Sequence, residues 1–315
     1  MEIRMHQLLG LGLVLVALAA CKKEQPDGFY YEPQSVVGQK LVQNNVCGVY
    51  KDTTFLITPG VEESDLNILM NDGTRQIIYL VCADISRPGV SMRVMRQQAA
   101  GWTLKTPRAL AEEFSVPGER IVATTNGDYW SSGNMPRGPV RMGWAVYQDV
   151  FNVDANDPQQ AIGFVGINSL GNMMIAERDR YDSVKSTLKE CTGCGVLLVQ
   201  NGQIRDYPQW TALQPRTAIG MTSDGKVYML VGEGRSRNDG SRDRWEARGL
   251  AYSHMSAIFK ALGCKDAACL DGGGSSQLII RNPVSRTWQL RNQSAQAGGT
   301  ERPVANAWAV TVDEP

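Results

Sequence analysis

Apolar positions along this chain occur mostly in short runs, and two segments show helical spacing instead. In residues 249–263 an apolar stripe recurs along one side of a helix, which predicts an amphipathic helix. The stripe consists of Ala251, Met255, Ile258, Phe259 and Leu262. Residues 106–114 predict a second helix, because Thr106 suits the N-cap and Pro107 suits the first helical position.

The remaining apolar runs predict short strands separated by turns rich in Gly, Asp and Asn. The pairs Asp72-Gly73, Asn201-Gly202 and Asp224-Gly225 are typical of two-residue hairpin loops. We therefore expect an α+β fold with a mixed, mostly antiparallel β-sheet core and a few flanking helices. No internal repeat is visible, so residues 41–315 are expected to form one domain.

The N-terminus has the features of an export signal. The apolar run of residues 8–18 is too short to span a bilayer, and it leads into Leu18-Ala19-Ala20-Cys21. This motif resembles the lipobox of a bacterial lipoprotein. The resemblance implies a signal peptide at 1–20, a lipid on Cys21, a polar tether at 21–40 and a folded domain at 41–315. We then expect the protein in the bacterial cell envelope, periplasmic or at the cell surface, with the lipid as its one membrane contact.

Composition narrows the choice of partners and of chemistry. The 32 Lys and Arg residues balance 32 Asp and Glu residues, which argues against a nucleic-acid-binding surface. His254 is the one histidine outside the signal, so a multi-histidine metal site is excluded. Its position at the edge of the apolar stripe favours packing or the surface over catalysis. Acid–base chemistry is therefore expected from Asp and Glu, with Arg binding anionic groups.

Six cysteines remain after Cys21, and an even number in an exported protein predicts disulfides. The simplest pairing is Cys191–Cys194, Cys264–Cys269 and Cys47–Cys82. A redox role for the Cys191/Cys194 pair and a zinc site are less favoured alternatives, because a strand follows that pair and the two cysteine pairs lie far apart in sequence.

Polar residues gather where predicted strands end. In the first such cluster, an apolar strand leads into Asn126-Gly127-Asp128, followed by Tyr129 and Trp130. An Asx-Gly turn explains it in purely structural terms, whereas the adjacent aromatic rings also suit a wall for stacking a sugar.

The second cluster depends on the register of the hairpin that turns at Asp224-Gly225. A two-residue loop there places Arg216 directly opposite Glu233. This pair is either a cross-strand salt bridge or an arginine for phosphate beside a carboxylate for proton transfer.

The third cluster is Leu270-Asp271-Gly272-Gly273-Gly274-Ser275, between two apolar runs. A glycine-rich hairpin turn is the structural interpretation. Three glycines exceed what a tight turn needs, which favours an anion-binding backbone beside Asp271. In the fourth cluster, Arg302, Val304 and Asn306 alternate onto one face of a terminal strand, where an arginine is often only solubilising.

Together these motifs are similar to those of the phosphodiester glycosidase family. The resemblance runs in order through residues 126–130, Pro215-Arg216-Thr217 with the three residues after it, residues 270–275, and Arg302 with Val304. It covers most of the chain from about 45 to 312. The chain departs from the family pattern at Asp128, at the Tyr129-Trp130 pair, at Glu233 and near His254, positions that bear on sugar and aglycone specificity more than on the reaction class.

The resemblance implies hydrolysis of a sugar-1-phosphodiester of the GlcNAc-1-phospho-6-mannose type, giving free sugar and a phosphomonoester. Arg216, the backbone at Gly272, Gly273 and Gly274, and Arg302 are candidates to neutralise the phosphate. Asp271 or Glu233, with Asp128 third, is the candidate nucleophile or base. The residues expected to bind or orient substrate are Asn126, Asp128, Thr217, Ser275 and Asn306.

Two other functions stay open at this stage. One is a surface lipoprotein that binds carbohydrate or sugar phosphate without turnover, and the other is a phosphodiesterase that attacks phosphorus. No cofactor is required for the expected reaction, although Asp128, Glu233 and Asp271 could together bind a divalent cation.

Overall fold

The computed structural model describes residues 31–97, 101–114, 116–234, 246–296 and 299–314, which belong to one compact unit. The predicted signal peptide and Cys21 lie outside the described residues. Helix α1 (Val36–Gln43) is capped by Ser35 and packs against strand β1 and helix α4. The folded unit therefore includes residues that the sequence assigned to the tether. No helix in the described ranges is both long enough and apolar enough to cross a membrane.

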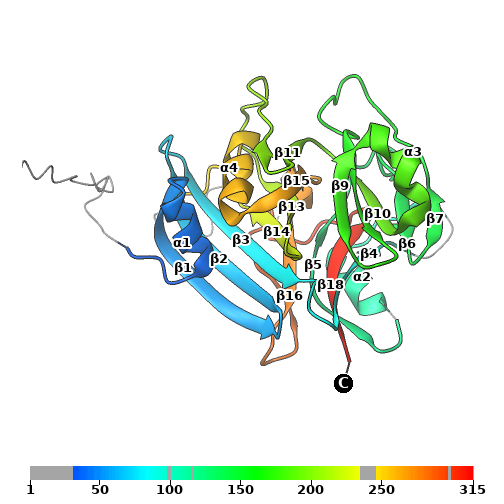
Figure 1. Ribbon diagram of the computed structural model, residues 1–315, viewed down its shortest axis with the longest axis horizontal. Helices are drawn as coiled ribbons and strands as arrows, with labels where there is room; N and C mark the ends of the chain where they lie inside the picture. The colour runs from blue at the N-terminus through cyan, green and yellow to red at the C-terminus, as the bar shows by residue number, and fades with distance from the viewer. Residues whose placement is uncertain (1–30, 98–100, 115, 235–245, 297–298, 315) are drawn as a thin grey trace, which may run out of the picture. The chain divides into compact units, whose positions relative to one another are not determined.

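In the described ranges the strands form three sheets, and each strand pairing within a sheet is antiparallel (Figure 1). The α+β prediction is confirmed. The first sheet has eight strands in the order β1 (Cys47–Thr58), β2 (Val61–Met70), β3 (Arg75–Asp84), β14 (Lys226–Gly232), β13 (Arg216–Thr222), β15 (Cys264–Cys269), β11 (Leu197–Gln200) and β12 (Gln203–Ile204).

The other two sheets have five strands each. The second sheet has the order β7 (Ala145–Gln148), β6 (Val140–Met142), β10 (Leu188–Cys194), β8 (Gly163–Asn168) and β9 (Met173–Glu177). The third has the order β17 (Trp288–Leu290), β16 (Leu278–Arg281), β5 (Glu119–Asn126), β18 (Ala307–Asp313) and β4 (Val90–Met95).

The helices are short and lie on the sheets. They are α1, α2 (Pro107–Glu113), α3 (Tyr181–Val184) and α4 (Tyr252–Leu262), with single 3-10 turns at η1 (Arg178–Arg180), η2 (Lys185–Thr187) and η3 (Gly273–Ser275). Both helices predicted from sequence are present. Thr106 caps α2, accepting the Ala109 N–H at 3.2 Å, and Gly263 ends α4 with a left-handed backbone.

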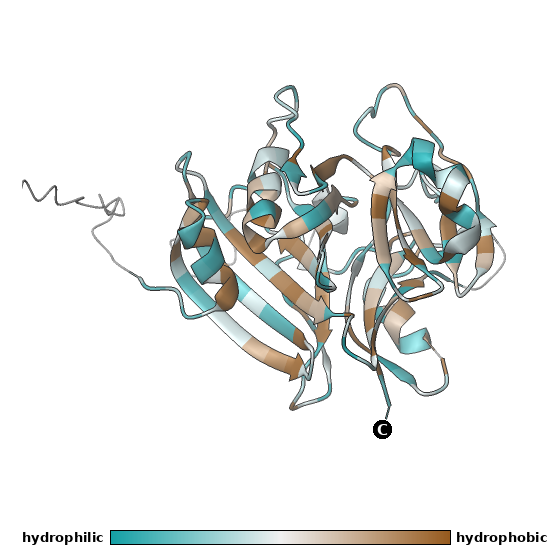
Figure 2. Cartoon of the chain, viewed as in Figure 1, coloured by the Kyte–Doolittle hydropathy of each residue, from teal (hydrophilic) through white to brown (hydrophobic). Residues whose placement is uncertain are grey.

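Two apolar layers cover the two faces of the eight-stranded sheet. Alternating side chains of β3 and β14 explain this, because Tyr79 and Val231 pack into the core shared with the other sheets, whereas Ile78 and Leu230 pack under α4. Figure 2 shows frequent hydrophobic, brown segments along the strands of this sheet. A residue near a strand end therefore faces either the core shared with the other sheets or the core under α4, because successive side chains point to opposite faces.

The register of the β13–β14 hairpin differs from the prediction by one residue. Arg216 pairs with Gly232, not with Glu233, because Lys226 donates its N–H to the Thr222 hydroxyl and the loop holds three residues. Gly225, at φ +90°, takes the left-handed position of that longer turn. The shift places Arg216 and Glu233 on opposite faces of the sheet.

The glycine-rich segment is not a hairpin turn. Strand β15 before it belongs to the eight-stranded sheet, whereas β16 after it pairs with β5 and β17 of the third sheet. Residues 270–277 therefore carry the chain from one sheet to another, which needs tighter backbone packing than a hairpin does.

The predicted disulfides are not formed, and the cysteines at 47, 82, 191, 194, 264 and 269 are free thiols. Cys191 and Cys194 lie on one strand, as do Cys264 and Cys269, so extended backbone holds the partners about 10 Å and about 16 Å apart. Cys47 pairs with Met70 of β2 and Cys82 with Glu62, eight positions away along the same strand. All three predicted pairings are wrong for this fold.

Candidate functional site

Asn126, at the end of β5, connects three of the predicted motifs. Its side-chain amide donates to the Asp271 carbonyl at 2.7 Å, and its Oδ1 accepts the Thr217 hydroxyl at 2.8 Å and the Gln277 N–H at 3.2 Å. Asn126 and Thr217 are both fully buried. Both were predicted to bind substrate, and the structure places them behind the glycine-rich segment, where they hold it in place.

Gly127 and Asn306 bring the ends of β5 and β18 together. The Gly127 N–H donates to the Asn306 carbonyl at 3.0 Å, and the Asp128 N–H donates to Asn306 Oδ1 at 2.8 Å. A Cβ on Gly127 would lie 2.0 Å from that Oδ1, so only glycine fits here. The side-chain amide nitrogen of Asn306 is buried and has no hydrogen-bond partner among the described residues. It is therefore a donor that a ligand oxygen could use.

Asp128 is a buried carboxylate in which one oxygen is hydrogen-bonded and the other is not. Its Oδ2 accepts the Gly138 N–H at 2.6 Å, while its Oδ1 has no hydrogen-bond partner within the described chain. Burial raises the pKa of Asp128 to about 7; the N–H groups of Gly138 and Tyr129 oppose this rise, and the nearby Asp271 charge adds to it. At neutral pH Asp128 is thus divided between its protonated and ionised forms.

Asp271 lies two residues after the end of β15, beside Asp128, and is half-buried. Its main-chain N–H donates to the Gly127 carbonyl at 3.0 Å, which fixes its position against the first motif. Burial raises the pKa of Asp271 to about 6, even though the Ser275 hydroxyl, the Arg302 charge, the Gly272 N–H and the Trp130 side chain all act to lower it. Asp271 is the more acidic member of the pair and the better candidate for a nucleophile or base.

The three glycines serve close packing more than anion binding. The Gly272 N–H donates to Asp271 Oδ1 at 2.9 Å and the Gly273 N–H to the Pro215 carbonyl at 2.9 Å, so neither is available to a phosphate. A Cβ on Gly272 would lie 3.0 Å from the Pro215 oxygen, and one on Gly274 would lie 3.1 Å from Arg302 Nη1. Gly273 has φ +60°. The expected anion-binding nest is therefore not supported at Gly272 and Gly273.

Two arginines border the carboxylate pair, in different ways. Arg302 is partly exposed, stacks on the Trp130 ring at 5.2 Å, and contributes positive charge to Asp271. Arg216 is buried under Gly272, where it contacts the Tyr252 ring at 4.3 Å and donates to the Tyr252 hydroxyl at 3.1 Å and the Leu250 carbonyl at 3.3 Å. Arg302 can reach a substrate directly, whereas Arg216 adds charge from below.

Glu233 lies on the opposite face of its strand from Arg216. Its Oε1 accepts the Gln293 N–H at 2.6 Å and the Tyr79 hydroxyl at 3.0 Å, and the residue is only 2% exposed. Gln293 belongs to the segment 291–296, whose Gln296 lies beside Gly274. The structure thus connects Glu233 to the glycine loop through this segment, separately from Asp128 and Asp271.

No group of three or more His, Cys, Asp or Glu in the described ranges is arranged to hold a metal ion. Asp128, Glu233 and Asp271 are accordingly not brought together as a cation site. His254 lies on α4, where its Nε2 is 2.8 Å from Asp72 Oδ2.

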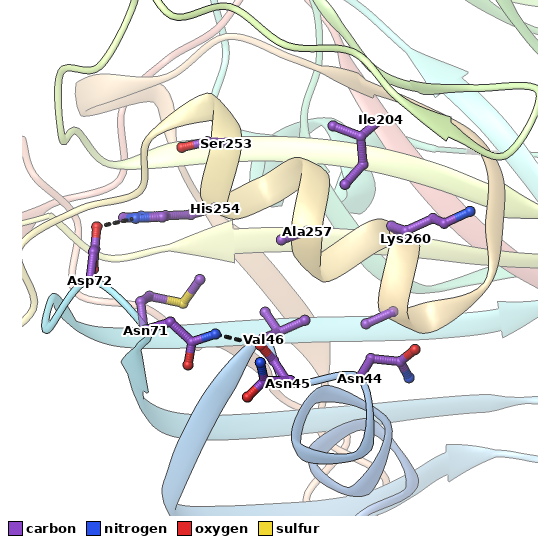
Figure 3. A pocket seen from close by; sticks show the side chains of 12 residues that line it. Asn44, Asn45, Val46, Asn71, Asp72, Ile204, Ser253, His254, Ala257 and Lys260 are labelled. Carbon is purple, nitrogen blue, oxygen red and sulfur yellow. Dashed lines mark hydrogen bonds and ion pairs between the residues drawn. The ribbon is translucent and has the colours of Figure 1, made fainter. Parts of the chain in front are cut away.

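His254 borders a pocket of about 400 Å³ between α4, the end of α1 and the β2–β3 turn (Figure 3). Its floor is apolar, and its rim carries Asn44, Asn45, Asn71 and Lys260. None of the predicted site residues lines it. Because α4 covers the outer face of the eight-stranded sheet, this pocket is separate from the carboxylates.

Two contributors to the site escaped the sequence analysis. Gly138 supplies the N–H that holds Asp128, and Tyr252 binds Arg216. Trp130, which the sequence analysis named as a possible sugar-stacking ring, supports Arg302. Gly138 and Tyr252 come from segments whose approach depends on tertiary packing.

The comparisons with known proteins agree with this arrangement of motifs. A family model described as phosphodiester glycosidase matches residues 119–311, which is more than half of the chain. The chain belongs to the phosphodiester glycosidase family. The matched range contains all the site residues described above except Tyr79.

A curated relative is the SPbeta prophage-derived uncharacterized protein YomE of Bacillus subtilis (strain 168). It is 26% identical over 175 aligned positions, and the match covers 51% of this chain and 24% of the relative. The chain therefore matches about a quarter of that protein's length.

Two solved structures share the fold. The zebrafish N-acetylglucosamine-1-phosphodiester alpha-N-acetylglucosaminidase catalytic domain, auto-inhibited by its pro-peptide, has a TM-score of 0.60 and 14% identity, covering 85% of this chain and 90% of that one. A hypothetical protein from Synechocystis has a TM-score of 0.59 and 14% identity, covering 84% of this chain and 64% of that one. At such identities the likeness shows the fold alone.

Proposed function

We propose that this protein hydrolyses a sugar-1-phosphodiester, breaking the C1–O bond to give free sugar and a phosphomonoester. The observation that carries the proposal is the carboxylate pair Asp128 and Asp271, whose pKa values are raised to about 7 and about 6, beside Arg302. Titratable pairs with raised and separated pKa values are typical of glycosidase sites. Membership of the phosphodiester glycosidase family supports the reaction class.

In this reaction the leaving group already carries negative charge, so stabilising that charge matters more than protonating it. Arg302 is placed to bind the phosphate, since it is partly exposed and lies against Gly274 and Trp130. Arg216, buried beneath Gly272, adds positive charge without touching the substrate. The Asn306 amide and the Asp128 Oδ1 are unpartnered polar groups that can orient sugar oxygens, as is the Ser275 hydroxyl.

Asp271 is the group we assign to the reacting carbon. With its pKa near 6 it is largely ionised at neutral pH, so it can attack C1 or remove a proton from the attacking water. Asp128 retains a proton over much of the same range, which keeps a second full charge away from the phosphate. For the sugar and the aglycone we propose N-acetylglucosamine-1-phospho-6-mannose as the model substrate.

The test is product identification with the protein from residue 22 onward. N-acetylglucosamine and mannose-6-phosphate should form with wild type, and Asp271→Asn should lower kcat by about 10³-fold or more. An Asp128→Asn control keeps an acceptor for the Gly138 N–H. Binding of the substrate without any turnover by wild type would instead favour a carbohydrate-binding protein.

We also propose that a lipid on Cys21 attaches the protein to the bacterial cell envelope, as the lipobox-like Leu18-Ala19-Ala20-Cys21 suggests. Membrane fractionation of cells expressing wild type and Cys21→Ser tests this. The variant should leave the membrane fraction, and its retention there would contradict the proposal.

A further inference from the structure

Two aromatic rings, one of them on β7, lie against the same buried arginine. Trp102 and Tyr147 flank the Arg96 guanidinium, whose carbon lies 4.6 Å from the first ring centroid and 4.1 Å from the second. Arg96 is only 6% exposed, yet Tyr147 is 37% exposed and Trp102 is partly exposed. The stack thus holds both rings in place while part of each ring stays exposed to water. Because the rings are already fixed, a ligand that stacks on them costs little further side-chain entropy.

The rings are continuous with the carboxylate site through the loop that follows Asp128. Trp130, which supports Arg302, forms a bridge with Pro136 at the other end of a tight turn. In that turn the Asn134 amide donates to the Trp102 carbonyl at 3.3 Å. The loop that places Trp130 beside Asp271 therefore also contacts the segment that carries Trp102.

A second connection fixes this segment next to Arg302. Lys105 and Val304 exchange both main-chain hydrogen bonds, at 3.1 and 2.9 Å. Trp102 lies three residues before Lys105, and Arg302 lies two residues before Val304. Gln148, adjacent to Tyr147, donates to the Pro136 carbonyl at 2.8 Å, which ties the hairpin to the same turn.

We infer that Trp130, Trp102 and Tyr147 form an aglycone-binding surface, where the saccharide attached to the phosphate stacks on aromatic rings beyond Arg302. This inference rests on the proposed function. Pyranose rings present flat C–H faces that suit fixed aromatic rings, and the turn that follows Trp130 carries hydroxyl and amide side chains at Ser131, Ser132 and Asn134 for sugar hydroxyl groups. A saccharide fits this mixture better than an acyl chain does.

The inference predicts a preference for an extended aglycone that depends on these rings. We would measure kcat/KM for N-acetylglucosamine-1-phosphate linked either to methyl or to carbon 6 of the terminal mannose of mannotriose. Wild type should favour the mannotriose substrate by about tenfold or more. Tyr147→Ala or Trp102→Ala should each lower the ratio of the two values by roughly three- to tenfold.

Matched variants separate stacking from general disturbance. Tyr147→Phe keeps the ring and should keep the ratio. Trp144→Ala removes a 49%-exposed ring at the tip of the same hairpin, outside the Arg96 stack, and should keep it too. An unchanged ratio in Tyr147→Ala and Trp102→Ala, or an equal fall in Trp144→Ala, would overturn the inference.

The two proposals can fail separately. If wild type hydrolyses the methyl substrate without favouring mannotriose, the proposed function stands and the aglycone surface is wrong. If wild type hydrolyses neither substrate, the surface is tested by adding mannotriose-6-phosphate and following tryptophan fluorescence. The fluorescence of wild type should change, and that of the double variant Trp102→Phe/Tyr147→Ala should not. Binding of anionic lipid vesicles through Tyr147, in place of the saccharide, would also overturn it.

Discussion

The side-chain amide of Asn126 donates to the main-chain carbonyl of Asp271 at 2.7 Å, which joins the end of β5 to the loop that carries the reactive carboxylate. On its other side Asn126 Oδ1 accepts from Thr217 and Gln277. The buried side-chain amide of Asn126 thus connects three motifs that are far apart in sequence. Its role is to hold Asp271 in position, and this leads to the first prediction.

Asn126→Ala should lower the free energy of unfolding by about 3 kcal/mol or more, because it leaves several buried donors and acceptors without partners. Urea unfolding followed by far-UV circular dichroism measures this. Asn126→Asp, which retains the acceptor but sets a carboxylate against the Asp271 carbonyl, should also reduce kcat. A variant with full activity and wild-type stability would contradict the positioning role.

The activity should depend on pH as a narrow bell. Protonation of Asp271, whose pKa is about 6, removes activity on the acid side. Ionisation of Asp128, whose pKa is about 7, removes it on the alkaline side by placing a second negative charge beside the phosphate. A pH profile of kcat/KM in Asp128→Asn should lack the alkaline fall, and an unaltered alkaline limb would show that another group causes it.

Glu63 should make stability depend on pH. It is fully buried beside Asp65, and its side chain accepts the Arg291 Nε–H at 2.6 Å. Burial, followed by the Asp65 charge, raises the pKa of Glu63 to about 8, so the folded protein keeps a proton that the unfolded chain releases near its ordinary value.

The free energy of unfolding should therefore fall by about 1.4 kcal/mol per pH unit from this group as pH rises from the ordinary glutamate range towards 8. Glu63→Gln removes this slope, whereas Glu62→Gln, at its exposed neighbour, should not. Chemical denaturation at a series of pH values measures both. Equal slopes in wild type and Glu63→Gln would contradict the protonated state of Glu63.

Gly127→Ala should reduce activity through Asn306. The added Cβ would lie 2.0 Å from Asn306 Oδ1, so the amide must move and release the Asp128 N–H. Combining Gly127→Ala with Asn306→Ser gives the added methyl group more space, so the double variant should lose less than the sum of the two single losses. Strict additivity in kcat/KM would contradict direct contact.

The cysteines should behave as six free thiols, five of them buried and Cys82 partly exposed. In the protein from residue 22, a thiol reagent without reductant should react slowly in buffer and with six equivalents after denaturation in guanidinium. If no thiol reacts in denaturant, the disulfides expected from the sequence are present after all.

Local patterns predicted both helices and where the chain turns, because caps and glycines act over a few residues. The loops at Asp72-Gly73 and Asp224-Gly225 each hold three residues, not the two that were predicted. Thr106, Pro107 and Gly263 mark helix ends where expected, and Asn201 with Gly202, both at positive φ, form a two-residue loop. The one-residue error at Arg216 arose because the Thr222 hydroxyl replaces a main-chain acceptor and extends the turn, which the Asp-Gly pair alone does not reveal.

The site motifs could be found in the sequence, but the role of each residue within them could not. Asn126 and Asp128 are two residues apart, yet one is a saturated buried amide and the other a carboxylate with an unpartnered oxygen. That difference depends on Gly138, Thr217 and Gln277, which come from other parts of the chain. Likewise, the cysteine count suggested pairs, but strand geometry separates each predicted pair.

The most direct test of C1–O hydrolysis is the reaction in ¹⁸O-labelled water, with mass spectrometry of both products. We expect the label in the hydroxyl at C1 of the released sugar and none in the phosphomonoester, with formation of both products lost in Asp271→Asn. Label in the phosphate would show attack at phosphorus and contradict the assignment of Asp271 to the sugar carbon.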